Sequence, residues 1–138
     1  MADLVYDLAR QSFMNGGFDL TTDTVKIMLV RTGAGHYVVN GATDQFVTAI
    51  ASGDRIAISA QLTSVSTTAG VFDAANTLWA AVAAGAACGA FVVFKDTGTP
   101  STSPLIAYVD SYSGLPVTPN GSDINVSFPT DPNKILKL

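Results

Sequence analysis

The segment from Phe91 to Phe128 places the tightest limits on what this chain can fold into. Two apolar runs, FVVF and PLIAYV, flank a loop made almost entirely of Gly, Thr, Ser, Pro and Asp. A third run, DINVSF, follows the turn TPNGSD. Short apolar runs separated by turn residues are typical of antiparallel strands. The segment therefore predicts a hairpin and its return strand, and it indicates a β-rich structural or binding module.

The acidic residues also favour a fold rich in turns. All eleven are Asp, and the 138-residue chain contains no Glu. Asp is favoured in turns and caps, whereas Glu is a helix former. The net charge of −4 argues against nucleic-acid binding, which requires a positive surface facing the phosphates.

The chain is more apolar than its size predicts. Charged residues make up 13% of it, and its mean hydropathy is +0.35. A chain of this length forms one domain, so we expect residues 1–138 to share a single core. The high hydropathy predicts that other subunits cover part of the apolar surface. The alternative is a surface rich in Ala, Gly, Ser and Thr.

The N-terminal residues predict one helix, over residues 3–14. Its apolar residues fall near one face at helical spacing: Leu4, Val5, Leu8 and Phe13. Asp3 would favour the positive end of the helix dipole. The sequence NGG at 15–17 ends the helix, because glycine accepts the left-handed cap conformation.

Alternating apolar residues and turn signals predict strands along the rest of the chain. Their ranges are 24–31, 55–62, 71–73, 76–82, 86–95, 104–110, 123–128 and 134–137. In the second of these, Ile56, Ile58 and Ala60 share one face. Residues 32–53 form a long excursion with little regular structure.

The Ala-rich segment 76–93 has two possible interpretations. The propensity of alanine favours a helix, whereas two glycines and the run into FVVF favour strands. We choose two strands that join at Ala84–Gly85. The whole pattern then predicts a mainly β fold, an antiparallel β-sandwich of jelly-roll or Ig-like type with one short N-terminal α-helix.

The candidate catalytic residues do not form a catalytic pattern. His36 is the single histidine, and no Cys/His spacing suits a metal. Cys88 lies among apolar residues and is expected to be buried and inert. The glycines of Gly33–Gly35 lack the third glycine of a phosphate loop. We therefore expect no enzyme activity, no metal and no cofactor.

Two further patterns have ordinary structural explanations. Asp110 and Asp123 flank the hairpin like paired carboxylates, but Asp is also the usual residue of turns. Five aromatic residues could form a platform for sugars, although their spacing in strands fits a core equally well. They are Trp79, Phe91, Phe94, Tyr108 and Tyr112.

The sequence also bears on where the protein resides. No basic segment followed by an apolar core marks a secretory signal. The longest apolar run, 78–94, is interrupted by two glycines and makes a poor membrane span. We expect a product that is soluble in the cytoplasm and does not enter a membrane.

The order of these elements resembles a known family. The chain opens with a helix, NGG, FDL and TTDTVKIMLV, continues with the element FDA and a strand carrying Trp79, and closes on NKILKL. The most specific matches are KDTGT, STSPLIAY and GLPVTPNG. In these features the chain is similar to the small virion proteins of tailed bacteriophages and prophages, and the similarity covers nearly its whole length.

This resemblance implies a structural protein of the virion, and no catalytic residues are carried over. The first expectation is a capsid decoration, or cement, protein that bridges major capsid subunits on the surface of the expanded head. Such a protein would be assembled in the cytoplasm of the host bacterium and would form a homo-oligomer, a trimer or a dimer. The alternatives are a tail or neck component and a β-sandwich module that binds a host-surface glycan.

Three segments are the expected contact regions of such a protein. They are the N-terminal helix, the excursion at 32–53 and the polar loop that follows FVVF. The candidate interface residues are Leu4, Leu8, Phe13, His36, Tyr37, Phe46, Thr97, Thr99 and Ser101.

Overall fold

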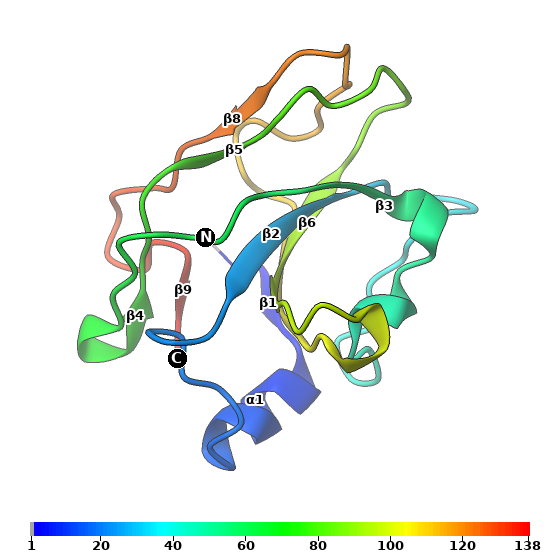
Figure 1. Ribbon diagram of the computed structural model, residues 1–138. Helices are drawn as coiled ribbons and strands as arrows, with labels where there is room; N and C mark the ends of the chain where they lie inside the picture. Colours follow the sequence, from blue (N-terminus) through cyan, green and yellow to red (C-terminus); the bar gives the residue numbers. More distant parts are fainter. Residues whose placement is uncertain (1) are drawn as a thin grey trace.

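A computed structural model describes residues 2–138 as a mainly β fold with antiparallel sheets and one helix near the N-terminus (Figure 1). The fold class predicted from the sequence is therefore confirmed. The strands are β1 (Leu4–Val5), β2 (Val25–Val30), β3 (Arg55–Ile58), β4 (Val71–Phe72), β5 (Thr77–Trp79), β6 (Ala90–Lys95), β7 (Leu105–Val109), β8 (Ile124–Val126) and β9 (Leu136–Lys137). The helix α1 spans Asp7–Met14, and short 3-10 turns lie at 47–49, 52–54, 68–70 and 100–102.

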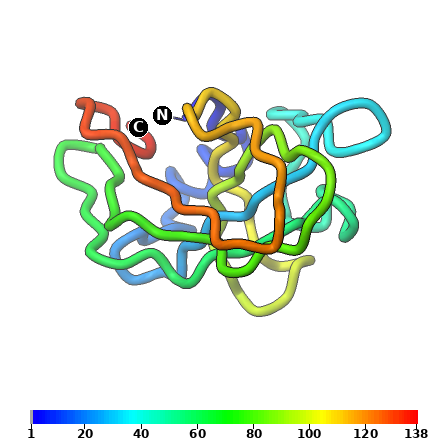
Figure 2. Tube along the Cα trace, turned by 90° about the horizontal axis from the view of Figure 1, so that it is seen from above, coloured from blue at the N-terminus to red at the C-terminus, as the bar shows by residue number. Residues whose placement is uncertain are grey.

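Five strands form the central sheet, in the order β1-β7-β6-β2-β3. Two separate ladders, β4-β9 and β5-β8, complete the β structure. In Figure 1, β5 and β8 lie together at the top and α1 lies at the bottom. The Ala2 N–H donates to the Ile135 carbonyl at 2.9 Å, which places the first described residues beside the C-terminal segment, and the two marked ends lie close together in Figure 2.

Both faces of the central sheet are covered. Phe91 and Val92 are successive residues of β6, so they point to opposite faces. On one face the Trp79 ring of β5 packs edge-on against Phe91, with centroids 6.0 Å apart. On the other face Tyr37, from the excursion at 32–53, packs against Tyr108, the β7 partner of Val92. The sheet is therefore the middle layer of a sandwich-like core.

The helix begins later than the sequence predicts. We expected it to start near residue 3, but Leu4 and Val5 form β1 and pair with Tyr108 and Ala107 of β7. Apolar residues at positions 4 and 5 suit a short strand as well as a helix, and the edge of the sheet decides between them. Asp3 does not act on the helix dipole, because its carboxylate accepts the N–H groups of residues 110 and 111.

The strand predicted at 55–62 ends at Ile58. Its expected apolar face is not the buried one, since Ile58 is 51% exposed whereas Ser59 is 4% exposed. Ser59 is buried because its hydroxyl accepts the N–H of Ile27 at 3.1 Å and donates to the Ala60 carbonyl at 2.8 Å.

The other elements agree more closely with the predictions. The Ala-rich segment contains β5 and the start of β6, joined by irregular chain at 80–89, so the interpretation as two strands is confirmed and the helical one is wrong. The excursion at 32–53 contains no strand and only short 3-10 turns. Strands β2, β4, β7, β8 and β9 fall within the predicted ranges.

Trp79 connects the β5-β8 ladder to the central sheet, so its substitution tests how these two parts pack together. It is 1% exposed, and its indole N–H donates to the Ile27 carbonyl at 3.2 Å. We predict that Trp79→Ala lowers the free energy of unfolding by about 4 kcal/mol, because a large core side chain is lost. Urea denaturation followed by far-UV circular dichroism measures the change.

Leu78 provides the matched control, since it neighbours Trp79 in β5 and is 38% exposed. We expect Leu78→Ala to cost about 1 kcal/mol or less. Equal losses for the two variants would contradict the packing of β5 against the central sheet.

Candidate functional site

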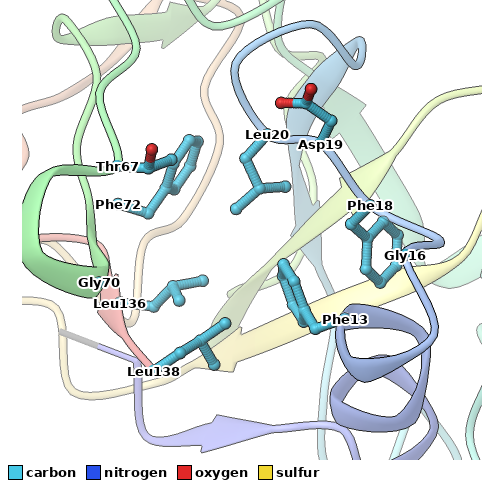
Figure 3. Close-up of a pocket in the computed structure, with 10 residues that line it drawn as sticks. All are labelled: Phe13, Gly16, Phe18, Asp19, Leu20, Thr67, Gly70, Phe72, Leu136 and Leu138. Atoms are coloured by element: carbon cyan, nitrogen blue, oxygen red, sulfur yellow. The ribbon is translucent and has the colours of Figure 1, made fainter.

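An apolar groove of about 490 Å³ opens to solvent between α1 and the β4-β9 ladder (Figure 3). Six apolar side chains line it from both sides: Phe13, Phe18, Leu20, Phe72, Leu136 and Leu138. In Figure 3 these side chains point toward a common centre. We call this feature the apolar groove.

The helix wall of the groove depends on how α1 ends. The Gly17 N–H donates to the Ser12 carbonyl at 2.7 Å, and the Gly16 N–H donates to the Phe13 carbonyl at 3.3 Å. This paired arrangement is a Schellman motif, and Gly16 adopts the positive φ of 76° that it requires. The reversal brings the rings of Phe13 and Phe18 to a centroid distance of 4.7 Å. The sequence NGG thus ends the helix, as predicted, and also shapes this wall.

The residues that follow the reversal are held by the carboxylate of Asp23. It accepts the N–H of Asp19 at 2.8 Å and forms an ion pair with Lys95 of β6 at 3.2 Å. This contact fixes the turn that carries Phe18 and Leu20 against the end of the central sheet.

The opposite wall is the β4-β9 ladder. Phe72 pairs with Leu136, and both side chains are almost fully buried. The Leu138 N–H donates to the Gly70 carbonyl at 3.0 Å, which holds a half-exposed leucine at the rim. This wall of the groove is therefore apolar and largely buried, and its rim at Leu138 is apolar and in contact with water.

Of the predicted interface residues, only Phe13 lines the groove. Phe18, Leu20, Phe72, Leu136 and Leu138 were not predicted. Their sequence signal is present in FDL, directly after the glycines that end the helix, and in the alternation of leucine and lysine in ILKL. The sequence does not show that these distant segments meet.

Three of the other predicted interface residues lie near the start of α1. Leu4 and Leu8 are half-buried, and Leu4 lies against Gly41 of the excursion. Tyr37 is 6% exposed, its hydroxyl lies 2.9 Å from that of Tyr6, and it donates to the Asp44 carboxylate at 2.7 Å. Tyr37 therefore holds the excursion against the central sheet. Because its side chain is buried, it is not available to contact a partner, contrary to the prediction from the sequence.

His36 is paired with a carboxylate. Its Nδ1 lies 2.7 Å from Oδ1 of Asp54, a side chain that is mostly buried. Within residues 2–138 no serine or cysteine side chain is hydrogen-bonded to the imidazole. The pair joins the two ends of the excursion and lacks the adjacent nucleophile of a catalytic triad.

The polar loop at 97–103 and Phe46 lie together. Thr97, Thr99 and Ser101 are exposed, as expected of a contact tip. The loop is ordered by its own hydroxyl groups, with Thr97 Oγ1 lying 2.6 Å from Thr102 Oγ1. Half-buried Phe46 forms a β-bridge with Pro104 at the end of the same loop. The loop therefore presents a stiff polar tip.

The remaining candidates take structural roles. Cys88 is buried, as predicted, and burial raises the pKa of its thiol. The Asp123 carboxylate accepts the N–H of Ala81 at 2.7 Å, which is an ordinary turn contact. No group of three His, Cys, Asp or Glu side chains within residues 2–138 is arranged to hold a metal ion.

The proposed aromatic platform is mostly core. Trp79, Phe91, Phe94 and Tyr108 are all less than 10% exposed. Tyr112 is half-buried, packs edge-on against Phe91, and accepts the N–H of Ser127 at 3.1 Å. These rings do not offer a flat stacking surface for a sugar.

Comparison with known proteins does not assign the chain to a family. No protein-family model matches the sequence, and no curated protein matches it either. Among the described residues, no helix is long and apolar enough to cross a membrane.

An ion pair at the start of the polar loop makes a pH-dependent prediction. Lys26 Nζ donates to Asp96 at 2.6 Å, and this bond, with one from the Gly98 N–H, lowers the pKa of the Asp96 carboxyl. A carboxyl whose pKa is lower in the folded state stabilises the fold above its unfolded pKa, and this stabilisation is lost as the pH falls through the folded value.

We therefore expect Asp96→Asn to be less stable than the wild type by about 0.5 kcal/mol at neutral pH. The difference should shrink below pH ~4 and also in high salt. Urea unfolding between pH 7 and pH 3 measures it. A difference that stays constant over this range would contradict the role of the ion pair.

Proposed function

We propose that this chain is a structural protein of a tailed-bacteriophage virion that decorates the expanded head by binding where major capsid subunits meet. The proposal rests on the resemblance carried by KDTGT, STSPLIAY and GLPVTPNG, and on one observation of the structure. That observation is the apolar groove, which keeps Phe13, Phe18 and Leu138 in contact with solvent. An open apolar site of this kind on a soluble domain is typical of a surface that binds another protein.

The groove suits an apolar segment of a capsid subunit. One wall is held by the pairing of β4 with β9 and the helix wall by the Schellman motif, so little ordering is needed on binding. Preorganisation of this kind lowers the entropic cost of association. One apolar anchor in such a groove supplies a contact that is repeated at every equivalent position of the head.

The physical effect of decoration is mass action. A protein that binds only the assembled shell stabilises it by RT ln(1 + [L]/Kd) at each site, which is about 2.7 kcal/mol at one hundred times Kd. Many modest contacts, repeated by symmetry, then oppose the internal pressure of the packaged DNA. This role needs a stable module with a defined docking surface, and it needs no catalytic group.

The direct test mixes purified protein with expanded heads that lack it. We expect the protein to cosediment with the heads and to raise the temperature at which they release DNA. Protein that copurifies with tails and does not bind heads would contradict the head assignment. Binding to a glycan array without binding to heads would favour the host-surface alternative.

A pair of variants tests the groove itself. Leu138→Asp places a charge on a residue that lines the groove and is 52% exposed, so the fold should tolerate it. We expect this change to weaken head binding at least tenfold, because a carboxylate would have to be desolvated in an apolar contact. Val38→Asp is the control, since Val38 is 73% exposed and does not line the groove. Equal binding by the two variants would rule the groove out as the docking site.

A further inference from the structure

The two edges of the central sheet differ in how they are closed. At the β1 edge, the chain on either side of the strand is bonded to other segments. The Ala2 N–H donates to Ile135, and the Asp7 N–H donates to Gly41. At the β3 edge, the Arg55 N–H is bonded within the preceding 3-10 turn and the Ala60 carbonyl accepts the neighbouring Ser59 hydroxyl. Every backbone hydrogen bond that joins residues 55–61 to another strand goes to β2. Within residues 2–138, the β3 edge is therefore open.

The backbone of Ile58 points outward at this edge. The Ser59 N–H donates to the Ile27 carbonyl at 2.9 Å and the Ile27 N–H donates to the Ser59 hydroxyl, so the backbone groups of Ile27 and Ser59 face each other, as at a hydrogen-bonded position of the ladder. Hydrogen-bonded and non-hydrogen-bonded pairs alternate along an antiparallel ladder, so the pair Met28 and Ile58 is of the second kind. The N–H and C=O of Ile58 consequently face away from β2 and toward solvent.

The side chains at this edge lack the features that usually prevent an edge strand from pairing with another chain. From Ile56 to Phe72 the sequence contains no charged residue and no proline. Natural sheet edges are usually protected by lysine, proline or inward-pointing charge. A β-bulge opposite Leu29 and Val30 protects only the Arg55 end. The loop at 83–86 lies beside that same end, next to Ile56, and Ile58 remains 51% exposed.

We propose that the β3 edge is the interface with a second copy of this chain, in which the two β3 strands pair antiparallel about a twofold axis at Ile58. The outward N–H and C=O of each Ile58 then bond to those of the other, as a hydrogen-bonded pair requires. Ile56 faces Ala60 of the second copy, whose small side chain fits beside the loop at 83–86. The two central sheets become one continuous sheet.

Electrostatics favours a second copy as the occupant. Each chain carries a net charge of −4, so two copies approach best through uncharged surface. In the proposed register no like charges stand opposite each other, because Arg55 faces Gln61. The two Arg55 side chains are six residues apart along the paired strands, roughly 20 Å, which is well beyond the screening length.

Sedimentation equilibrium of the isolated full-length protein tests this proposal without any head or other virion component. We expect a dimer for the wild type. Ile58→Lys should raise the dimer dissociation constant at least tenfold, because it places two like charges opposite each other. Val38→Lys, which adds the same charge at another exposed apolar residue, should leave the dimer unchanged.

Two further variants separate the backbone contact from a general loss of fold. Ile58→Pro removes the outward N–H and none of the bonds to β2, so it should give a folded monomer by circular dichroism. Ile58→Cys should form an intermolecular disulfide on oxidation, because paired Cα atoms about 5.5 Å apart suit a disulfide. Val38→Cys should not form one, and Cys88 is buried and should not react.

A wild-type protein that stays monomeric up to its solubility limit would overturn the proposal. So would a trimer, which antiparallel pairing about a twofold axis cannot build. A dimer that persists unchanged in both Ile58→Lys and Ile58→Pro would also overturn it, because the contact would then lie elsewhere. Failure of head binding would leave these outcomes unaffected, since no head is present in the experiment.

Discussion

The structure depends on the burial of both faces of its central strands. Ala90–Phe94 of β6 and all of β7 are buried, and such strands are stable only if apolar layers cover them on both sides. The chain provides one cover as the β5-β8 ladder, with Trp79 at its centre. It provides the other from the excursion at 32–53, through Tyr37. A segment without regular structure thus serves as half of the core's covering.

A covering segment without regular structure, such as the excursion at 32–53, brings polar side chains into the interior. These side chains are hydrogen-bonded to one another or to the backbone. Within residues 2–138, every buried side-chain nitrogen or oxygen atom has a hydrogen-bond partner. The clearest case joins Tyr6, Tyr37 and Asp44, where burial is the main cause that raises the pKa of both tyrosine hydroxyls. These hydroxyl groups remain neutral, so they can donate and accept hydrogen bonds without placing a charge in the core. Such bonds give the excursion a defined position, which apolar contacts alone would not specify.

The sequence correctly predicts those elements that are determined by residues close together in the chain. FVVF and PLIAYV form the central strands, and NGG ends the helix. The Ala-rich segment forms two strands, as its two glycines and the run into FVVF predicted, and the second of them, β6, pairs with both β2 and β7. The failures occur where distant residues decide. Leu4 and Val5 leave the helical pattern to pair with β7, and Ser59 is buried because its hydroxyl satisfies the backbone of Ile27. The groove was missed for the same reason, since Phe18 and Leu136 are far apart in sequence.

The hydrogen bond between Ala2 and Ile135 has a consequence for the order of folding. The β1 strand pairs with residues about one hundred positions away, and the segment before it is held by residues still further along the chain. Contacts of such high sequence separation form slowly, because the entropy of closing a long loop is lost before any bond is gained. During synthesis, the N-terminal residues leave the ribosome first but cannot pair until residues 107 and 108 of β7 emerge, and the segment before β1 is held only once residue 135 follows. Until β1 pairs with it, β7 has a neighbour only on its β6 side, and the nascent chain exposes a second open edge.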